Sequence, residues 1–393
     1  MLDTLPAQSP DALLALIKMH AADPRSEKID LGVGVYRTNE GTTPVFASIK
    51  QAEQRLIAEQ QSKSYLGPEG DTRFVRALCP YIFGDDAALL ERIDGMQTPG
   101  GTGAVRLAVS LAAKAGVTRF HLGVPSWPNH RQILEDVGVE AATFDHANPD
   151  GTANVDALLD LIAKGGKGEA VLLHGCCHNP TGIDYTPQHW EQIADALVKS
   201  GMLPILDIAY QGLGHGMDED VAGVRTVLKA VPEALIAYSC DKNFGLYRDR
   251  VGAFYMMART PQHLPDIASN ANALARANWS MPPDHGAAAV RIILEDDALT
   301  TIWLDELADM RARINRVRDR LAAADDTVPG LGLATLAQQS GLFAMLPLDK
   351  PQIDALREDH AVYMAGSGRI NVAGLHQGNI ERFLSALRAV TQG

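Results

Sequence analysis

The sequence has few cysteines and no long hydrophobic run. Its 393 residues include four cysteines, Cys79, Cys176, Cys177 and Cys240, which are too few and too irregularly spaced for a disulfide framework. No apolar stretch reaches the roughly 18 residues that a membrane-spanning helix needs. We therefore expect a protein that does not span a membrane and that resides in a reducing compartment.

Positive charge is also scarce. The formal net charge is -13 and there is no run rich in Lys and Arg, so the chain lacks the basic surface on which nucleic-acid binding depends. The N-terminal segment MLDTLPAQSPDALLALIKMH has acidic residues before its apolar stretch and no basic region, which predicts no secretory signal. We expect a cytoplasmic protein with no nucleic-acid partner. A few arginines gathered in a cleft could still bind anionic metabolites.

Strands and helices alternate over the middle of the chain. Short apolar runs such as EAVLLHG, LPILDIAY and ALIAYS are separated by stretches with helical spacing, the pattern of a parallel sheet covered on both faces. We therefore predict an α/β fold whose large domain holds a mostly parallel seven-stranded sheet. Ligands of such sheets gather beyond the carboxyl ends of the strands.

The chain is longer than one hydrophobic core usually supports, so we expect two domains. The predicted large domain is 44–310, and a smaller, discontinuous α+β domain combines 1–43 with 311–393. A long helical region at about 287–324 is expected to join them.

The motif TPGGTGA, at 98–104, has three glycines in four positions and opens a helix. Free backbone N–H groups and the helix dipole at such a turn suit a phosphate. The motif matches neither the dinucleotide nor the nucleotide-triphosphate pattern. A plain helix-opening turn is the competing interpretation.

Lys242 follows the apolar run ALIAYS, with Ser239 three residues before it and Arg250 eight after. A lysine beside an apolar layer can lose its proton and attack a carbonyl to form a Schiff base. Ser239 and Arg250 could hold a phosphate next to it. The competing interpretation is an exposed lysine at the end of a strand.

Asp207 lies inside the apolar run PILDIA, where an ionised carboxylate needs a positive partner. The protonated nitrogen of a pyridine ring is one such partner, as in pyridoxal phosphate bound to a lysine. A salt bridge to a helix residue would satisfy the carboxylate equally well.

Three further residues stand at predicted strand ends. Trp127 could stack on a flat cofactor, and Asn179 and Tyr210 could bond its phenolic oxygen, but a core aromatic, a turn asparagine and a core tyrosine would fit these positions too. The run HGCCH, 174–178, suggests a metal at first sight. Because neighbouring strand residues point to opposite faces, we expect Cys176 and Cys177 not to share one ion, and we predict no metal site.

Six motifs together resemble the class I aspartate and aromatic amino acid aminotransferases, pyridoxal phosphate enzymes of fold type I. In chain order they are PGGTGA, PSWPNH, HGCCHNPTG, the D-x-A-Y of LDIAYQG, KNFGLYRDRVG and SGRINVAG. They cover nearly the whole chain. The resemblance implies pyridoxal 5'-phosphate as cofactor, amino acids and 2-oxo acids as substrates, ping-pong transamination and a homodimer with shared active sites.

The resemblance also implies a role for each matching residue. Lys242 would bind the cofactor covalently and move a proton, Asp207 would pair with the pyridine nitrogen with His130 behind it, and Tyr210 would assist. The remaining cofactor contacts would be Gly101, Thr102, Trp127, Asn179, Ser239, Arg250 and the partner's Tyr65. Substrate contacts would be Gly34, Val35, Trp127, Asn179, Arg369, and Arg276 from the other subunit.

Three positions depart from the family pattern. Asp241 stands where serine is usual and adds negative charge beside the expected phosphate, whereas Met281 and Ser64 replace asparagines of the aspartate-specific branch. We therefore expect a dual enzyme for acidic and aromatic amino acids. Val35 and Thr43 fit a strict aspartate aminotransferase equally well. A lyase or decarboxylase of the same fold is a further hypothesis, as is a pyridoxal-binding protein silenced by Asp241.

Overall fold

The computed structural model describes residues 2–7 and 12–392, and the chain divides into two compact units. We call them the sheet unit and the discontinuous unit. The sheet unit comprises Pro44–Ala312 and Gln339–Gly341. The discontinuous unit comprises Met1–Thr43, Arg313–Gln338 and Leu342–Gly393.

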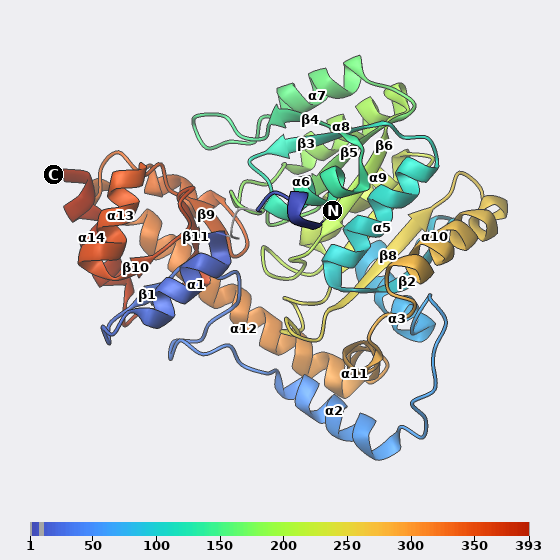
Figure 1. The fold of residues 1–393 in the computed structure, drawn as a ribbon, viewed down its shortest axis with the longest axis horizontal. Coiled ribbons are helices and arrows are strands. Elements are labelled where there is room, and N and C mark those ends of the chain that lie inside the picture. Colours follow the sequence, from blue (N-terminus) through green and yellow to red (C-terminus); the bar gives the residue numbers. More distant parts are fainter. Residues whose placement is uncertain (1, 8–11, 393) are drawn as a thin grey trace. The chain divides into compact units, whose positions relative to one another are not determined.

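A seven-stranded sheet forms the centre of the sheet unit (Figure 1). Its strands are β2 (Ile93–Pro99), β3 (Arg119–Val124), β4 (Glu140–Asp145), β5 (Glu169–His174), β6 (Leu203–Ile208), β7 (Ala234–Ser239) and β8 (Val251–Met257). They lie in the order β2-β8-β7-β6-β5-β3-β4. Strand β8 runs antiparallel to both of its neighbours, and the remaining pairs are parallel.

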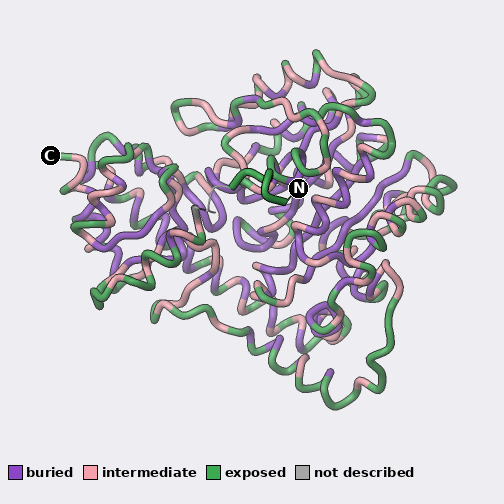
Figure 2. Tube along the Cα trace, in the orientation of Figure 1, coloured by how far each residue is buried: buried purple, intermediate pink, exposed green. Residues whose placement is uncertain are grey.

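The sheet unit also contains helices. They are α2 (Ala47–Glu59), α3 (Thr72–Phe83), α4 (Ala87–Leu90), α5 (Gly100–Lys114), α6 (Pro128–Val137), α7 (Val155–Lys164), α8 (Pro187–Ser200), α9 (Ala222–Ala230), α10 (Leu264–Asn278), α11 (Asp284–Leu294) and the part of α12 (Asp297–Ala322) up to Ala312. Helix α5 packs on β7 and β8 through small residues such as Ala104 and Ala108, which bury fully against Ala237 and Phe254. Strands β7 and β8 are buried along their whole length, so the sheet is the core of this unit (Figure 2).

This architecture confirms the predicted α/β fold with a mostly parallel seven-stranded sheet. One local prediction was wrong, because the helical region expected at about 287–324 is two helices, α11 and α12. The side chain of Asp296 accepts hydrogen bonds from the N–H groups of Ala298 and Leu299, both at 3.0 Å. Asp296 therefore starts a new helix where apolar spacing alone suggested continuity.

The discontinuous unit contains two small sheets and several helices. Strand β1 (Ile29–Asp30) pairs in parallel with β10 (Val362–Tyr363), and β9 (Phe343–Met345) pairs antiparallel with β11 (Arg369–Asn371). The α-helices are α1 (Ala12–Ala22), α13 (Lys350–His360), α14 (Ile380–Gln392) and the part of α12 from Arg313 onward. Short 3-10 helices, such as Leu333–Gln338 and Val372–Gly374, complete it.

Across residues 2–7 and 12–392, we find no helix with the length and apolar character needed to cross a bilayer.

Candidate active site

One edge of the seven-stranded sheet carries a cavity of about 210 Å³. The carboxyl ends of β2, β3, β5, β6 and β7 meet at this edge, together with the start of the antiparallel strand β8. Because side chains beyond these ends converge, polar residues far apart in sequence become neighbours. The cavity is lined by Gly101, Thr102, Trp127, His174, Asn179, Asp207, Ala209, Tyr210, Ser239, Asp241, Lys242, Tyr247 and Arg250.

Lys242 lies in the loop three residues beyond β7, and its side chain is half-buried in the cavity wall. Its Nζ atom sits over the ring of Tyr210, 5.0 Å from the ring centroid. Loss of water around the amine lowers the pKa of Lys242 below its usual 10.5, while the carboxylates of Asp241 and Asp207 oppose that shift. A larger fraction of this amine is therefore neutral and nucleophilic at neutral pH than for a surface lysine.

Asp207 occupies the fifth position of β6 and is 4% exposed. Its Oδ2 atom is 2.9 Å from Nε2 of His130, a fully buried residue on α6. The other oxygen, Oδ1, is buried and has no hydrogen-bond partner. A buried, unpartnered carboxylate oxygen facing a cavity is costly, so this position fits a ligand that brings a donor or a positive charge.

Behind Asp207 a hydrogen-bonded chain continues away from the cavity. The hydroxyl of Ser126 is 2.9 Å from Nδ1 of His130 and 3.1 Å from Nε2 of His174. The ring of His178 packs against His174, with centroids 4.2 Å apart. His146 then stacks flat on His178, with centroids 3.6 Å apart and planes 5° apart. Four imidazoles thus form a row that holds the Asp207 side chain in one orientation.

Burial is the main influence on the pKa values of three histidines of this row. It lowers the pKa of His174 and of His178 well below the usual 6.5, and it lowers the pKa of His146 as well. These three rings are therefore neutral at physiological pH. A hydrogen bond between Nε2 of His146 and the carbonyl of Ile183, at 2.8 Å, makes this nitrogen the protonated one in the neutral ring.

The glycine-rich turn and the start of α5 form one wall of the cavity. Gly100 has φ +69, and a Cβ atom there would lie 2.6 Å from Nη2 of Arg250. On the other side, a Cβ atom on Gly252 would lie 2.6 Å from the carbonyl carbon of Gly100. The absence of a side chain at Gly100 lets the Arg250 guanidinium approach the backbone, and its absence at Gly252 lets the backbones of Gly252 and Gly100 approach each other. The preceding Pro99 provides no side-chain cap, so the first N–H groups of α5 are free to bind an anion.

Arg250 and Asp241 form an ion pair beside this wall. The N–H group of Val251 also donates to Oδ1 of Asp241, at 3.2 Å. Burial raises the pKa of Asp241 above its usual 3.8, although Lys242 and Arg250 limit the rise. The negative charge that departs from the family pattern is therefore balanced by an arginine, and Asp241 takes up part of the capacity of Arg250 to bind a phosphate.

The remaining predicted residues of this edge lie in the loops beyond the strands, Trp127 three residues past the end of β3 and Asn179 five past the end of β5. Trp127 is the N-cap of α6 and meets His130 edge-on, with centroids 5.1 Å apart. Asn179 and Tyr210 are each 5% exposed and line the same cavity. Ser239, at the end of β7, accepts a hydrogen bond from the N–H of Asp241 at 3.3 Å, which leaves its hydroxyl hydrogen for another acceptor.

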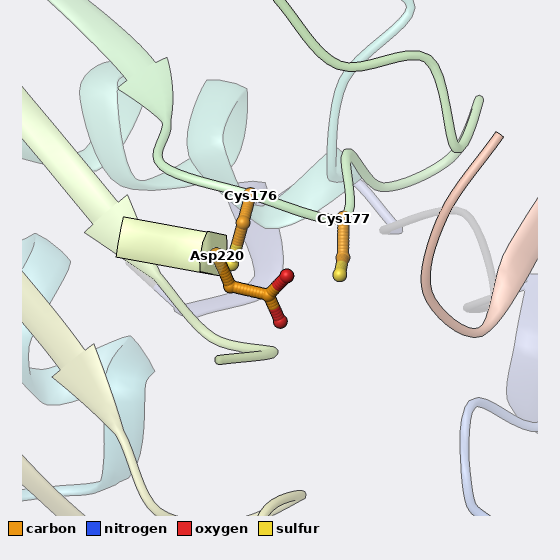
Figure 3. A group of neighbouring side chains, drawn as sticks. All are labelled: Cys176, Cys177 and Asp220. Carbon is orange, nitrogen blue, oxygen red and sulfur yellow. The ribbon is translucent and has the colours of Figure 1, made fainter. Parts of the chain in front are cut away.

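The two adjacent cysteines lie close to Asp220 (Figure 3). Sulfur atoms of Cys176 and Cys177 and a carboxylate oxygen of Asp220 all lie within 4.8 Å of one another. The expectation that the cysteines point to opposite faces was wrong, because β5 ends at His174 and Cys177 has φ 50, which breaks strand alternation.

Chemistry nevertheless argues against a metal at this cluster. The Asp220 carboxylate accepts the N–H groups of Gly212, Gly214 and His215 at 2.7–3.0 Å and so organises that loop. A hydrogen bond with Cys176 and burial raise the pKa of Cys177 well above 9.0. Asp220 therefore has a structural role in its loop that requires no metal ion.

Two predicted site residues of the sheet unit lie outside the cavity lining. Tyr65 is 94% exposed, on the loop between α2 and α3. Arg276, in the last turn of α10, is exposed and donates to the hydroxyl of Ser280 at 2.5 Å. The structure does not bring these two side chains into the cavity of their own chain, as expected for residues assigned to a neighbouring subunit.

Three other predicted residues, Arg369, Gly34 and Val35, belong to the discontinuous unit. Arg369 begins β11, donates to the carbonyl of Gly32 at 2.9 Å and lies over the ring of Phe343, 4.6 Å from its centroid. Gly34 packs so tightly on Phe343 that a Cβ atom there would lie 2.6 Å from its Cζ atom. The same ring therefore positions both the arginine and the glycine.

The segment that carries Gly34 and Val35 is also tied to β11 through its backbone. The side-chain amide of Asn371 donates to the carbonyls of Val33 and Val35, at 2.6 and 2.7 Å. Asn371 is fully buried, so these two hydrogen bonds hold the segment in a fixed position beside Arg369.

Sequence reasoning missed three residues of this site. His174 and Tyr247 line the cavity, and Ser126 connects His130 to His174. The position of His174 at the carboxyl end of a buried strand was a usable signal. Nothing in the local pattern marks Ser126 or Tyr247, because their role depends on packing between elements.

Comparisons with known proteins agree with this geometry. Residues 26–387 match the family model described as "Aminotransferase class I and II". The chain is 47% identical over 378 residues to a tyrosine aminotransferase of Rhizobium meliloti (strain 1021), covering 95% of this chain and 96% of that protein. It is 40% identical over 395 residues to the aspartate aminotransferase of Escherichia coli (strain K12), covering 99% and 100%.

A solved structure is similar over the full length. It is an aromatic-amino-acid aminotransferase from Burkholderia pseudomallei covalently bound to pyridoxal phosphate, with a TM-score of 0.96 and 30% sequence identity. The match covers 100% of this chain and 99% of that chain.

Proposed function

The chain belongs to the class I and II aminotransferase family and is an aminotransferase, and from this premise we propose its cofactor, substrates and site residues. It is a pyridoxal phosphate-dependent transaminase of the aspartate and aromatic type. It moves an amino group between aspartate, glutamate or an aromatic amino acid and a 2-oxo acid such as 2-oxoglutarate or oxaloacetate, by a ping-pong mechanism.

One observation carries this proposal. A single cavity holds a lysine with a lowered pKa, Lys242, and a buried carboxylate oxygen without a partner, Oδ1 of Asp207. Pyridoxal phosphate has a carbonyl that reacts with an amine and a ring nitrogen that is stabilised by a carboxylate. The free N–H groups at the start of α5, with Ser239 and Arg250, supply donors for its phosphate.

Each residue of the site has a separate role in the proposed reaction. Pyridoxal phosphate, when bound, supplies an electron sink for the bond broken at the substrate α-carbon. The Nζ atom of Lys242, whose pKa is lowered, would accept the proton from that carbon and later donate it back. Asp207, oriented by His130, would hold the pyridine nitrogen through Oδ1, its oxygen without a partner. Tyr210, whose ring carries the Lys242 amine above it, helps hold the amine in position.

The other cofactor contacts follow from the cavity lining. Trp127 would hold the ring, Asn179 and Tyr210 the phenolic oxygen, and Gly101 and Thr102 the phosphate. Their convergence at one sheet edge supports these assignments. The partner subunit supplies Tyr65, and its exposure of 94% in the single chain is consistent with a residue that becomes covered on dimerisation.

Two arginines recognise the two carboxylates of a dicarboxylic substrate. Arg369 binds the α-carboxylate and Arg276 of the other subunit binds the side-chain carboxylate, each as a bidentate fork worth about 3 kcal/mol when shielded from water. Gly34, Val35, Trp127 and Asn179 complete the substrate site. This arrangement favours transamination of dicarboxylates over lyase or decarboxylase chemistry, which needs no second carboxylate site.

We further propose that the enzyme is a cytoplasmic homodimer. Its cofactor-binding domain is 44–310, and 1–43 with 311–393 form the small domain. Because Tyr65 and Arg276 are assigned across the interface, each active site requires both subunits. Mixed dimers of Lys242→Ala and Arg276→Ala subunits are expected to regain activity toward dicarboxylates.

The test is a half-reaction followed by absorbance. The purified enzyme should show a cofactor band that shifts when an amino acid is added and returns when a 2-oxo acid is added. Lys242→Ala should lose turnover, because the Schiff base and the proton transfer both depend on this amine. Lys229→Ala, a change in the last turn of α9, is the matched control and should retain it. Near-normal transamination by Lys242→Ala would disprove the proposal.

A further inference from the structure

A second cavity, of about 300 Å³, lies wholly within the discontinuous unit and contains none of the residues assigned above. Three arginines of α12, Arg313, Arg316 and Arg320, line it, spaced so that they share one side of the helix. His376 and Glu381, from the turn before α14 and its first residues, line the opposite wall. In a chain with a net charge of -13, such a concentration of arginine is unusual.

Carbonyl and amide oxygens, with no carboxylate at hydrogen-bond distance, stabilise the charge of Arg313. This residue is 7% exposed, and its guanidinium donates to the carbonyls of Thr38, Ala373 and Leu375 at 2.9–3.3 Å. A further bond reaches Oδ1 of Asn39 at 3.1 Å. Burial lowers the pKa of Arg313 below its usual value. These contacts, with the centroid of the Tyr36 ring 5.3 Å from the guanidinium carbon, stabilise a full positive charge in the cavity wall.

Arg316 and His376 offer donors to an incoming group. Arg316 is exposed and forms no ion pair within the described part of the chain. The N–H of Gly378 donates to Nδ1 of His376 at 3.1 Å, so the neutral ring carries its proton on Nε2. Nε2–H is then available as a donor.

The start of α14 adds to the positive potential. Ile380 and Glu381 line the cavity at the N-terminal end of this 13-residue helix, where the helix dipole favours an anion. Glu381 is paired with Arg320 at 2.5 Å, through side chains that are 60% and 43% exposed. An exposed pair of this kind is weak and exchanges readily with solvent. The charge of Glu40 also acts on Arg313 and His376 and raises the pKa of both.

From these features we propose that the cavity is a binding site for a small oxyanion, the phosphate or carboxylate group of a metabolite. Planar guanidinium groups match the paired oxygens of both anions, and the exposed Glu381 marks the position that such an anion would take over beside Arg320. A cavity of about 300 Å³ accommodates a small molecule. This proposal is independent of the transaminase reaction.

Binding can be measured by calorimetry on the cofactor-loaded enzyme, whose own phosphate site is then filled. Inorganic phosphate and citrate are titrated separately, so that the two arms distinguish a phosphate site from a carboxylate site. Arg316→Ala is expected to raise Kd by about tenfold, the loss of one charged hydrogen-bonding partner. Glu381→Gln should lower Kd several-fold, because Arg320 is freed from its competing carboxylate.

Arg388→Ala is the matched control, since Arg388 donates to the hydroxyl of Thr327 and does not line the cavity. It should bind both probes as the wild type does. If circular dichroism shows that Arg316→Ala does not fold, His376→Gln is measured in its place. The proposal is overturned if the wild type binds neither probe at millimolar concentration, or if the cavity variants change Kd by less than about twofold.

Discussion

Nε2 of His130 lies 2.9 Å from Oδ2 of Asp207, while Oδ1 of the same carboxylate is buried and has no partner. One oxygen is therefore held by the protein and the other is left for a ligand. Asp207→Asn should lower kcat/KM by about 100-fold or more, since removing one member of a buried charge pair costs roughly 2–5 kcal/mol.

The control for this change is His130→Gln. This change retains the Asp207 carboxylate and removes only the imidazole that orients it. It should therefore lower kcat/KM less than Asp207→Asn does. Steady-state kinetics with saturating cofactor make the comparison. If Asp207→Asn keeps kcat/KM within threefold of the wild type, the assigned role of this carboxylate is wrong.

Asp241→Ser should tighten cofactor binding. The Asp241 carboxylate pairs with Arg250, and its removal leaves that guanidinium for the phosphate, which we expect to lower the Kd of pyridoxal phosphate by about tenfold. Fluorescence titration of the apoenzyme measures this. Asp249→Ser, which also removes a negative charge close to Arg250 in sequence, is the control for a general charge effect and should leave Kd nearly unchanged.

The effect of Asp241 should depend on pH in a defined direction. Because burial raises its pKa, the carboxylate loses its charge at a higher pH than an ordinary aspartate. The wild type and Asp241→Ser should therefore become more alike in cofactor affinity as the pH falls. A difference in Kd that grows toward acid pH would contradict the assignment.

The histidine row makes folding stability sensitive to acid. His146, His174 and His178 have folded pKa values below 6.5, so below about pH 6.5 the unfolded chain binds more protons than the folded chain. Stability is then present above the unfolded pKa and is lost as pH falls, by up to about 1.4 kcal/mol per pH unit for each histidine.

Urea unfolding of the apoenzyme at pH 7.5 and pH 5.5, at one fixed protein concentration, tests this expectation. His146→Phe keeps a flat ring on His178 while removing one titrating group, so it should reduce the loss between the two pH values by up to about 1.4 kcal/mol. His285→Phe, an exposed histidine on α11, is the matched control and should not. Equal losses in wild type and His146→Phe would contradict the prediction.

Substrate range should be broad. Arg276 is held by one neutral hydroxyl, that of Ser280, and Met281 accepts the N–H of Leu66 at 3.0 Å, next to Tyr65. An arginine without a charged partner is easily displaced, and a thioether packs well against an aromatic ring. We expect aspartate and phenylalanine both to be substrates, with Arg276→Leu losing activity mainly toward aspartate and Met281→Asn losing it mainly toward phenylalanine.

Comparing kcat/KM for the two amino acids in the three proteins decides this point. A wild-type preference for aspartate above about four decades, roughly 5.5 kcal/mol in transition-state binding, would instead indicate a strict aspartate aminotransferase. Arg388→Leu serves as the control for removal of an arginine elsewhere in the chain.

The sequence by itself determined the α/β fold class and the residues that end each strand. Apolar runs such as ALIAYS predict buried strands because burial of that many apolar side chains outweighs weaker local preferences. The position of Lys242, just beyond the end of a strand, follows from the residue at which this run stops. Six ordered motifs likewise determined the family before any distance was known. Apolar spacing in the sequence did not determine helix boundaries that depend on a single polar cap, such as the one at Asp296.

Only the tertiary structure decided which side chains meet. Ser126, His130 and Asp207 come from a loop, a helix and a strand, and their hydrogen bonds depend on how α6 packs on the sheet, which periodicity does not encode. The same holds for the pairing of Asp241 with Arg250 and for the cavity between Arg316 and His376, which are 60 residues apart. Sequence patterns report the environment of each segment, whereas the partner of a polar group is set by register and packing between segments.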